Sequence, residues 1–280
     1  MFLSKFFHAF ATTLCVTVFM IASAFARTPA EISKSGYVLI GVYDENASLL
    51  GHRDDAGVWH GYDEYLAARL AKDLGVELRL VPISAQERIS ATKTGKVDIM
   101  LGNFSHTKER AQEVDFSLPY MKAYLGLVSR GGAIDDPEKI HNKKIAAPSG
   151  TAALDYLWSE YYASVTIVEK PDYLSTFKVL IDGEVDGVLI DNTEAVAWAR
   201  SHPGFGVGLP KIGNPDPVAP AVRKGEFELL KWLDAEMETL GAELFFHADY
   251  EKTLKPVFGD VLKADDVVID GKCDFCDFSK

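Results

Sequence analysis

A run of polar side chains, Asn103 to Arg110, directly follows a predicted buried strand at Val97 to Leu101. Ligands of open α/β sheets bind outside the carboxyl ends of strands, where this run would lie. It offers an amide and two hydroxyl groups (Asn103, Ser105 and Thr107) and ends in Arg110. The guanidinium fork suits a carboxylate held by two parallel hydrogen bonds, so the run predicts an anion site. The alternative is a capped helix start with a solvated arginine.

The chain then continues with a longer pattern, Thr-x-Glu-Arg-Ala-x-x-Val-Asp-Phe-Ser-x-Pro-Tyr, at Thr107 to Tyr120. This pattern resembles the signature of the periplasmic amino-acid-binding proteins of ABC importers, which form bacterial solute-binding protein family 3. The segments Val222-Arg-Lys-Gly and Phe246-His-x-x-Tyr-x-x-Thr-Leu-Lys-Pro resemble the end of such receptors. The resemblance implies a free amino acid as ligand, with Arg110 and Ser105 at its α-carboxylate.

A second group of donors lies at Ser149-Gly150-Thr151, before a predicted helix at Thr151 to Tyr161. Free backbone N–H groups and the helix dipole favour an anion at a helix start. An ordinary helix cap explains the same residues. The family uses the equivalent turn for the ligand carboxylate, which implies that role for Gly150 and Thr151.

An acidic residue, Asp191, follows the predicted strand Gly187 to Ile190 and therefore lies at a strand's carboxyl end. The resemblance implies that Asp191 binds the ligand ammonium together with the carbonyl of Asn103 and the hydroxyl of Ser105. The alternative is that Asp191 caps a helix at Asn192 to Arg200.

The pocket for the ligand side chain departs from the family pattern. Many relatives stack the ligand between two aromatic residues, whereas this chain has Ala47 and Ala85 at those positions, and His106 replaces a usually apolar residue. The remaining candidates favour a polar or charged side chain and leave the amino acid unidentified. They are Asp44, Glu45, Asn46, His52, Arg88 and Phe104.

Strands alternating with helices indicate βαβ units and an α/β fold with mainly parallel sheets. The resemblance implies the two-lobed periplasmic-binding-protein fold of type II. We expect a discontinuous first lobe at residues 27–126 and 218–280 and a second lobe at 127–217. The chain would cross between them near Leu125 to Ser129 and Pro217 to Arg223, forming a two-strand hinge. The acidic tail after Gly259 is expected to be irregular.

The N-terminus, Met1 to Ala26, reads as a signal peptide with one Lys, an apolar run and Ala24-Phe25-Ala26 before Arg27. A membrane anchor is the alternative, but the apolar run is short for a bilayer. Cleavage removes one of 29 basic residues and leaves 28 against 41 acidic ones, a net charge of −13. So acidic a chain disfavours nucleic acid and anionic membranes. We expect a periplasmic monomer without membrane insertion, cofactor or metal, whose partners are a free amino acid and a membrane ABC permease.

Two further features bear on chemistry. Cys273 and Cys276 would form a local disulfide in an oxidising compartment, whereas the neighbouring acids disfavour a reactive thiol or a metal site.

The alternative function is an enzyme, because a few proteins of this fold are cyclohexadienyl dehydratases and need a proton donor in the cleft. Glu45, Glu87 and Glu194 are the only obvious donors, and none lies in a catalytic motif.

Overall fold

The computed structural model describes residues 27–43, 50, 52–53, 56–161, 163–270 and 273. The predicted signal peptide and three candidates for the side-chain pocket, Asp44, Glu45 and Asn46, lie outside these residues. For His52 only the backbone is described, in a short hairpin of β2 (His52–Arg53) and β3 (Trp59–His60). Within the described part of the chain, no helix is both long and apolar enough to cross a bilayer.

The first sheet has five strands in the order β4-β1-β5-β12-β6. The strand β1 runs parallel to β4 and β5, whereas β12 is antiparallel to β5 and β6. Its strands are β1 (Tyr37–Tyr43), β4 (Glu77–Ile83), β5 (Ile99–Met100), β6 (Val114–Phe116) and β12 (Ala221–Arg223). The helical elements of this part are α1 (Pro29–Ser35), α2 (Tyr62–Asp73), η1 (Ala85–Glu87), α3 (Arg88–Thr94), α4 (Lys108–Glu113), α8 (Phe227–Ala242), α9 (Phe245–Thr253), α10 (Lys255–Phe258) and α11 (Ala264–Val267).

The second sheet has the order β11-β7-β10-β8-β9. Its strands are β7 (Met121–Arg130), β8 (Lys144–Pro148), β9 (Thr166–Lys170), β10 (Gly187–Asp191) and β11 (Phe205–Val218). The helical elements here are η2 (Pro137–Ile140), α5 (Ala152–Tyr156), the π-helical segment η3 (Leu157–Tyr161), α6 (Tyr173–Ile181) and α7 (Asn192–Ser201). The two separate α/β sheets agree with the predicted fold class. The expectation of mainly parallel sheets was wrong, because β12 pairs antiparallel with β5 and β6, and β7 pairs antiparallel with β10 and β11.

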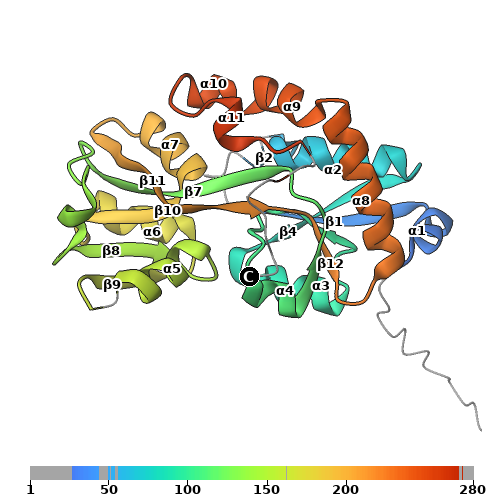
Figure 1. Ribbon diagram of the computed structural model, residues 1–280, viewed down its shortest axis with the longest axis horizontal. Helices are drawn as coiled ribbons and strands as arrows, with labels where there is room; N and C mark the ends of the chain where they lie inside the picture. Colours follow the sequence, from blue (N-terminus) through green and yellow to red (C-terminus); the bar gives the residue numbers. More distant parts are fainter. Residues whose placement is uncertain are drawn as a thin grey trace, which may run out of the picture.

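Two long antiparallel strands, β7 and β11, lead from the second sheet toward the first (Figure 1). Their pairing runs from Arg130 opposite Phe205 to Met121 opposite Val218. Val218 also bridges to Ser105, in the loop that follows β5. The expected crossings lie in or directly beside these strands, whereas motion about them stays a prediction.

The helices pack on the sheets through apolar faces. In α2, Leu66, Ala67, Leu70 and Ala71 are buried in a core that also includes α8 and α9. The expected strand at Val97 to Leu101 is regular only at Ile99–Met100, but the N–H groups of Asp98 and Leu101 still donate to β1. The apolar pattern therefore predicts the burial of this segment correctly but overestimates the length of the regular strand.

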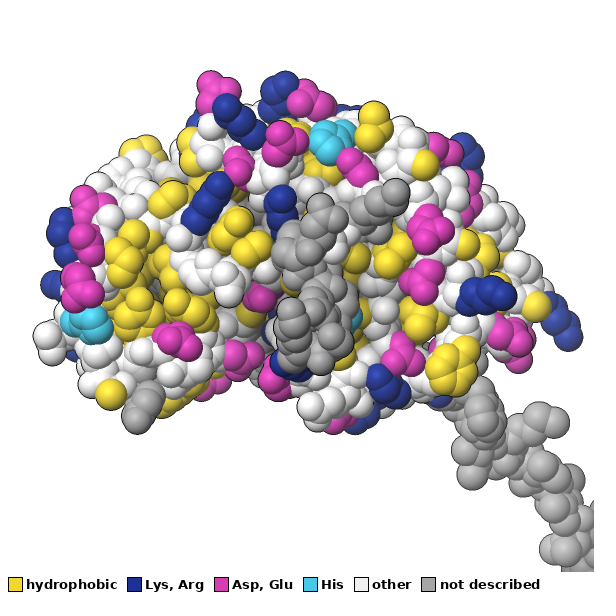
Figure 2. Space-filling view, in the orientation of Figure 1, with side chains coloured by type: hydrophobic (Ala, Val, Ile, Leu, Met, Phe, Trp, Pro, Cys, Tyr) yellow, Lys and Arg dark blue, Asp and Glu magenta, His cyan; other side chains and the backbone are white. Residues whose placement is uncertain are grey.

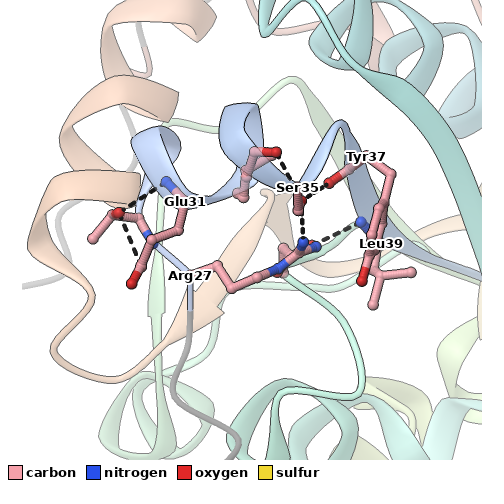
Figure 3. A network of polar contacts seen from close by, with 8 residues as sticks. Arg27, Glu31, Ser35, Tyr37 and Leu39 are labelled. Atoms are coloured by element: carbon pink, nitrogen blue, oxygen red, sulfur yellow. Dashed lines mark hydrogen bonds and ion pairs between the residues drawn. The ribbon is translucent and has the colours of Figure 1, made fainter.

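An ion pair fixes the start of the described chain on the first sheet (Figure 3). Arg27 Nε donates to Asp98 Oδ1 at 2.8 Å, and Arg27 Nη1 donates to Ser35 Oγ at 2.6 Å. Asp98 also accepts the backbone N–H of Leu39 at 2.7 Å, and the Arg27 guanidinium lies 4.5 Å from the centre of the Tyr37 ring. The pair thus joins the residue after the predicted cleavage point to Asp98, which directly precedes β5 and is bound to β1 through Leu39.

The prediction of an irregular tail after Gly259 was wrong at α11 (Ala264–Val267), whereas residues 259–263 and 268–270 form neither helix nor strand, although part of this tail is buried. Leu262, Val267 and Val268 are buried, Val268 bridges to Met121, and Ile269 N donates to the carbonyl of Tyr120 at 3.1 Å. The apolar run packs because it covers β7 where that strand leaves the second sheet. Cys273 is disulfide-bonded, and its expected partner Cys276 lies outside the described residues.

Charged side chains of both signs are interspersed over one face of the molecule, shown in Figure 2. The pattern fits the acidic but mixed composition of the chain.

Candidate functional site

Arg110 lies in the first turn of α4, which Thr107 caps by accepting the N–H of Arg110. The side chain is 6% exposed, which excludes a solvated arginine. Its Nη1 donates to the Ser105 carbonyl at 3.0 Å and its Nη2 to the Gly150 carbonyl at 3.1 Å. The guanidinium also lies 5.2 Å from the centre of the Phe104 ring. The cation is thus held by neutral groups, and one of them, the Gly150 carbonyl, lies in the turn between β8 of the second sheet and α5.

Burial lowers the pKa of Arg110 to about 10, and the nearby positive charge of Arg88 contributes to the same shift. Three carboxylates, Asp155, Asp191 and Asp216, oppose the shift. The guanidinium is therefore protonated at neutral pH. In the described part of the chain it forms no direct ion pair, so it can accept an anionic partner.

Arg88 lies deeper than a residue at a pocket edge, since it is only 4% exposed. Its guanidinium donates to four backbone carbonyls, those of Ala85, Gly102, Asn103 and Gly150. The Arg88 side chain therefore fixes the loops around the site. The sequence placed it among the side-chain pocket candidates, because nothing local reveals contacts with such distant carbonyls.

The turn before α5 brings the second sheet against the first. Gly150 has φ +72°, and a Cβ there would lie 2.9 Å from the Cα of Gln86. Only glycine fits this approach without displacing backbone. Thr151 caps α5 by accepting the N–H of Leu154, and its hydroxyl donates to the Pro148 carbonyl at 2.7 Å. The cap therefore exists, and it engages the hydroxyl while leaving the backbone N–H of Thr151 without an acceptor among the described residues.

Asp191 and Asn103 meet across the two sheets. Asn103 Nδ2 donates to Asp191 Oδ2 at 2.6 Å. Asp191 makes no side-chain hydrogen bond to cap α7, so the capping alternative is wrong. Burial raises the pKa of Asp191, and Arg88, Asn103 and Arg110 oppose the shift. The Asp191 side chain therefore bonds to Asn103 and does not cap α7.

Asn103 is positioned by residues that the sequence reasoning missed. Its backbone N–H donates to Asp63 Oδ2 at 3.1 Å, and the other Asp63 oxygen accepts the hydroxyl of Tyr120 at 2.5 Å. Burial raises the pKa of Asp63 to about 6, whereas the bonds from Tyr120 and Asn103 oppose the rise. The backbone carbonyl of Asn103, which was expected at the ligand ammonium, accepts a hydrogen bond from Arg88. The Tyr120 that closes the family signature is the one signal that could have suggested this network.

A cavity of about 430 Å³ lies beside Arg110, within the usual range for ligand sites. Residues beside both sheets line it. Gln86 in η1 and Arg110 in α4 adjoin the first sheet, and Gly150 follows β8 of the second. Phe104, a side-chain pocket candidate, lies in its wall and packs on Phe116 at 4.9 Å between ring centres. The other lining residues are Ala85, Ile89, Thr107, Glu109, Gln112, Glu113 and Asp155.

The two sheets touch at two further points near this cavity. Gln86 Nε2 donates to the Pro171 carbonyl at 3.0 Å, and the rings of Tyr43 and Tyr173 meet edge to face at 5.3 Å. These contacts join residues that are far apart in sequence, so no local pattern predicts them.

Two other titratable groups near the site, His106 and Glu87, have protonation states unsuited to donating a proton at neutral pH. Burial lowers the pKa of His106 to about 4, and its ring stacks on Phe116 at 4.3 Å, so it is neutral at pH 7. Glu87 accepts hydrogen bonds from the hydroxyl and N–H of Ser84, which lower its pKa. A carboxylate whose pKa is lowered is a poor proton donor at neutral pH. Glu194 is buried in the first turn of α7, and Glu45 lies outside the described residues.

A family model for the bacterial extracellular solute-binding proteins, family 3, matches residues 39–254. The chain belongs to this family. The match covers most of the chain and both sheets, which confirms the resemblance carried by Thr107 to Tyr120. The two-lobed type II fold is confirmed as well, by the solved structures that it resembles.

Two solved structures of the family are similar over nearly their whole length. A cysteine-binding protein of Campylobacter jejuni is 39% identical, with a TM-score of 0.81 over 86% of this chain and 98% of that one. A solute receptor for L-cysteine of Neisseria gonorrhoeae is 34% identical, with a TM-score of 0.82 over 87% and 100%.

More distant relatives bind or convert other compounds. An ABC transporter glutamine-binding protein of Bacillus subtilis is 25% identical over 236 residues, which are 81% of this chain and 85% of the relative. A cyclohexadienyl dehydratase of Pseudomonas aeruginosa is 26% identical over 212 residues, covering 71% and 76%. The family therefore contains both binding proteins and an enzyme.

Proposed function

We propose that this protein is an exported receptor that binds one free α-amino acid between its two sheets and delivers it to an ABC importer. The observation that carries the proposal is the pair of opposite charges at one site: the buried cation of Arg110 from the first sheet and the buried carboxylate of Asp191 from the second. A zwitterion presents the complementary pair of charges. Its ends would each meet a group on a different sheet.

The α-carboxylate binds Arg110. A guanidinium has five N–H groups, and the described hydrogen bonds of Arg110 use two of them. Three remain, enough for two parallel bonds to a carboxylate. The backbone N–H of Thr151 and the hydroxyl of Ser105 supply further donors, since neither has an acceptor among the described residues.

The ammonium binds Asp191. Asn103 supports this role, because its Oδ1 is buried and accepts no hydrogen bond in the described part of the chain. A buried acceptor without a donor costs free energy, which an ammonium N–H would recover. The Asn103 oxygen and the Asp191 carboxylate thus form two acceptors for one cationic group.

The ligand side chain occupies the cavity beside Arg110, and we propose cysteine as the first amino acid to test. The two relatives with the highest identities described above are a cysteine-binding protein and a receptor for L-cysteine. A small side chain is consistent with Ala85 in the cavity wall, where relatives were expected to carry an aromatic ring.

Ligand binding favours the closed arrangement of residues 27–126 and 218–280 against residues 127–217, with β7 and β11 as the hinge. The hydrogen bonds from Arg110 to Gly150 and from Gln86 to Pro171 already join the two parts. A ligand that contacts both parts has a higher affinity for the closed state and shifts the population toward it.

We further propose a monomeric protein, exported through cleavage after Ala26 to the periplasm, that docks on its permease in the closed state. Binding without catalysis is favoured because Glu87, one of three possible proton donors, is bound by Ser84 and has a lowered pKa.

The test is a screen of the common amino acids against residues 27–280 by thermal shift, followed by calorimetry. A ligand at one hundred times its Kd adds about 2.7 kcal/mol to the free energy of unfolding, which is readily detected. We expect cysteine or another small amino acid to give a saturable shift. The proposal would be refuted if none of the amino acids gave heat in calorimetry or a thermal shift.

A further inference from the structure

A third carboxylate lies near Arg110 and Asp191, on the long strand β11. Asp216 is half-buried and stands opposite Ala123 of β7. Among the described residues it has no hydrogen-bond donor, which distinguishes it from Asp63, Asp98 and Asp191.

The backbone of β11 explains how this carboxylate comes to the site. Between Ile212 and Asp216 the strand makes a bulge, because Ile212 pairs with Leu125 and Asp216 with Ala123. Gly213, at φ +72°, supplies the turn in the bulge. Bulges often redirect a side chain beside a functional site. The next residue, Pro217, accepts the N–H of His106, so Asp216 directly adjoins the loop that carries Ser105.

The electrostatics agree with this placement. Asp216 is one of three carboxylates that act on the charge of Arg110, and Asp191 in turn acts on Asp216. Burial, then repulsion by Asp191, raises the pKa of Asp216 to about 6, and Arg110 opposes the rise. At pH 7 Asp216 is therefore mostly ionised. The site then holds Asp191 and Asp216, with Asp155 in the cavity wall, whereas the ligand ammonium requires only one carboxylate.

We infer that Asp216 determines specificity: it excludes amino acids with anionic side chains and selects those with neutral or positively charged ones. The inference rests on the proposed function. Its physical basis is the surplus negative charge in a site sheltered from water, since juxtaposed like charges lower affinity. A neutral side chain avoids this repulsion, and a cationic side chain is attracted by the same carboxylates.

The experiment compares ligand pairs that differ mainly in charge: asparagine with aspartate, glutamine with glutamate, and cysteine with cysteine sulfinate. Calorimetry at pH 7.5 measures the Kd of each for residues 27–280. We expect the tightest ligand to be neutral or cationic, and each anionic member to bind at least tenfold more weakly than its neutral counterpart. For a cationic ligand such as arginine, the expected effect of Asp216→Asn is weaker binding.

The variant Asp216→Asn should reduce the anionic-to-neutral ratio of Kd at least tenfold. Asp182→Asn is the matched control, because Asp182 is a surface acid paired with Lys178 and its loss changes the net charge equally. That control should keep the wild-type ratio. Asp216→Ser, which retains a small polar group, serves if the asparagine variant does not fold.

Three results would overturn the inference: wild type preferring an anionic amino acid, a Kd ratio near one, or a ratio unchanged by both substitutions at Asp216. Each of these leaves the proposed function intact, because an amino acid still binds. Absence of binding by all amino acids to wild type would instead refute the proposed function and the inference with it.

Discussion

Replacing Arg110 by alanine should abolish tight binding without unfolding the protein. The structure supplies the magnitude. The guanidinium is 6% exposed, donates to two neutral carbonyls and has three N–H groups left for a ligand carboxylate. Removing one partner of a buried, hydrogen-bonded charge pair costs about 2 to 5 kcal/mol. The Kd should therefore rise roughly thirtyfold to several thousandfold.

The measurement is calorimetry with the best ligand, alongside the melting temperature of each ligand-free variant. Arg110→Lys should also bind poorly, because an ammonium cannot reproduce the planar fork. Arg88 is the matched control, since it is an equally buried arginine close by. It donates only to backbone carbonyls in the described part of the chain, so Arg88→Ala should lower the melting temperature more than Arg110→Ala does.

The refuting result is specific. If Arg110→Ala binds within about threefold of wild type, which is under 1 kcal/mol, the carboxylate is bound elsewhere. If Arg88→Ala loses affinity as strongly as Arg110→Ala and keeps the wild-type melting temperature, the two arginines have been assigned the wrong roles.

Three other predictions follow from named contacts. Gln86→Ala removes a hydrogen bond between the two sheets and should raise the Kd about two- to tenfold, whereas Gln112→Ala, in the same cavity wall, should not; equal effects in calorimetry would contradict a role in closure. Burial raises the pKa of Asp249 to about 8, so the folded state keeps a proton that the unfolded state loses, and stability falls as pH rises from about 4 to 8. Asp249→Asn should therefore increase the melting temperature at pH 7.5 and not at pH 4; the same gain at both pH values would contradict this. Arg27→Ala leaves the buried Asp98 without its cation and should lower the free energy of unfolding by about 1 to 3 kcal/mol in urea titrations; no change would mean that the pair is only a surface contact.

The sequence predicted several elements, and placed Asn103 and Asp191 at strand ends, because both depend on local pattern. The predicted helix at Thr151 to Tyr161 corresponds to α5 with η3, and the apolar run at Gly187 to Ile190 located β10. Polar residues directly after a buried strand gave Asn103 and Asp191, which the structure joins by a hydrogen bond at 2.6 Å. Because strand ends collect at one edge of a sheet, sequence position alone carried this information.

The interactions that support the site left no such pattern. Arg88 binds carbonyls up to 62 residues away, and any residue could supply a carbonyl, so no side chain identifies the partner. Asp63 likewise binds a backbone N–H 40 residues away. The prediction for the tail failed at α11 for a related reason, because the packing of this segment on β7 depends on where that strand leaves the second sheet. These long-range contacts are fixed by tertiary structure.

The two buried arginines explain why an anion should complete this site. Arg88 and Arg110 both donate to the Gly150 carbonyl, at 3.3 and 3.1 Å, and the positive charge of Arg88 helps to lower the pKa of Arg110. Neither forms a direct ion pair within the described residues, although Asp191 acts on both charges from a distance. Buried charges are stable when they are paired, and here the shared partner is a neutral carbonyl. A ligand carboxylate would supply the missing negative charge at Arg110, on the surface where the two sheets meet. Binding and closure should therefore reinforce each other, because the closed arrangement brings two cations to one carbonyl and the ligand relieves their repulsion.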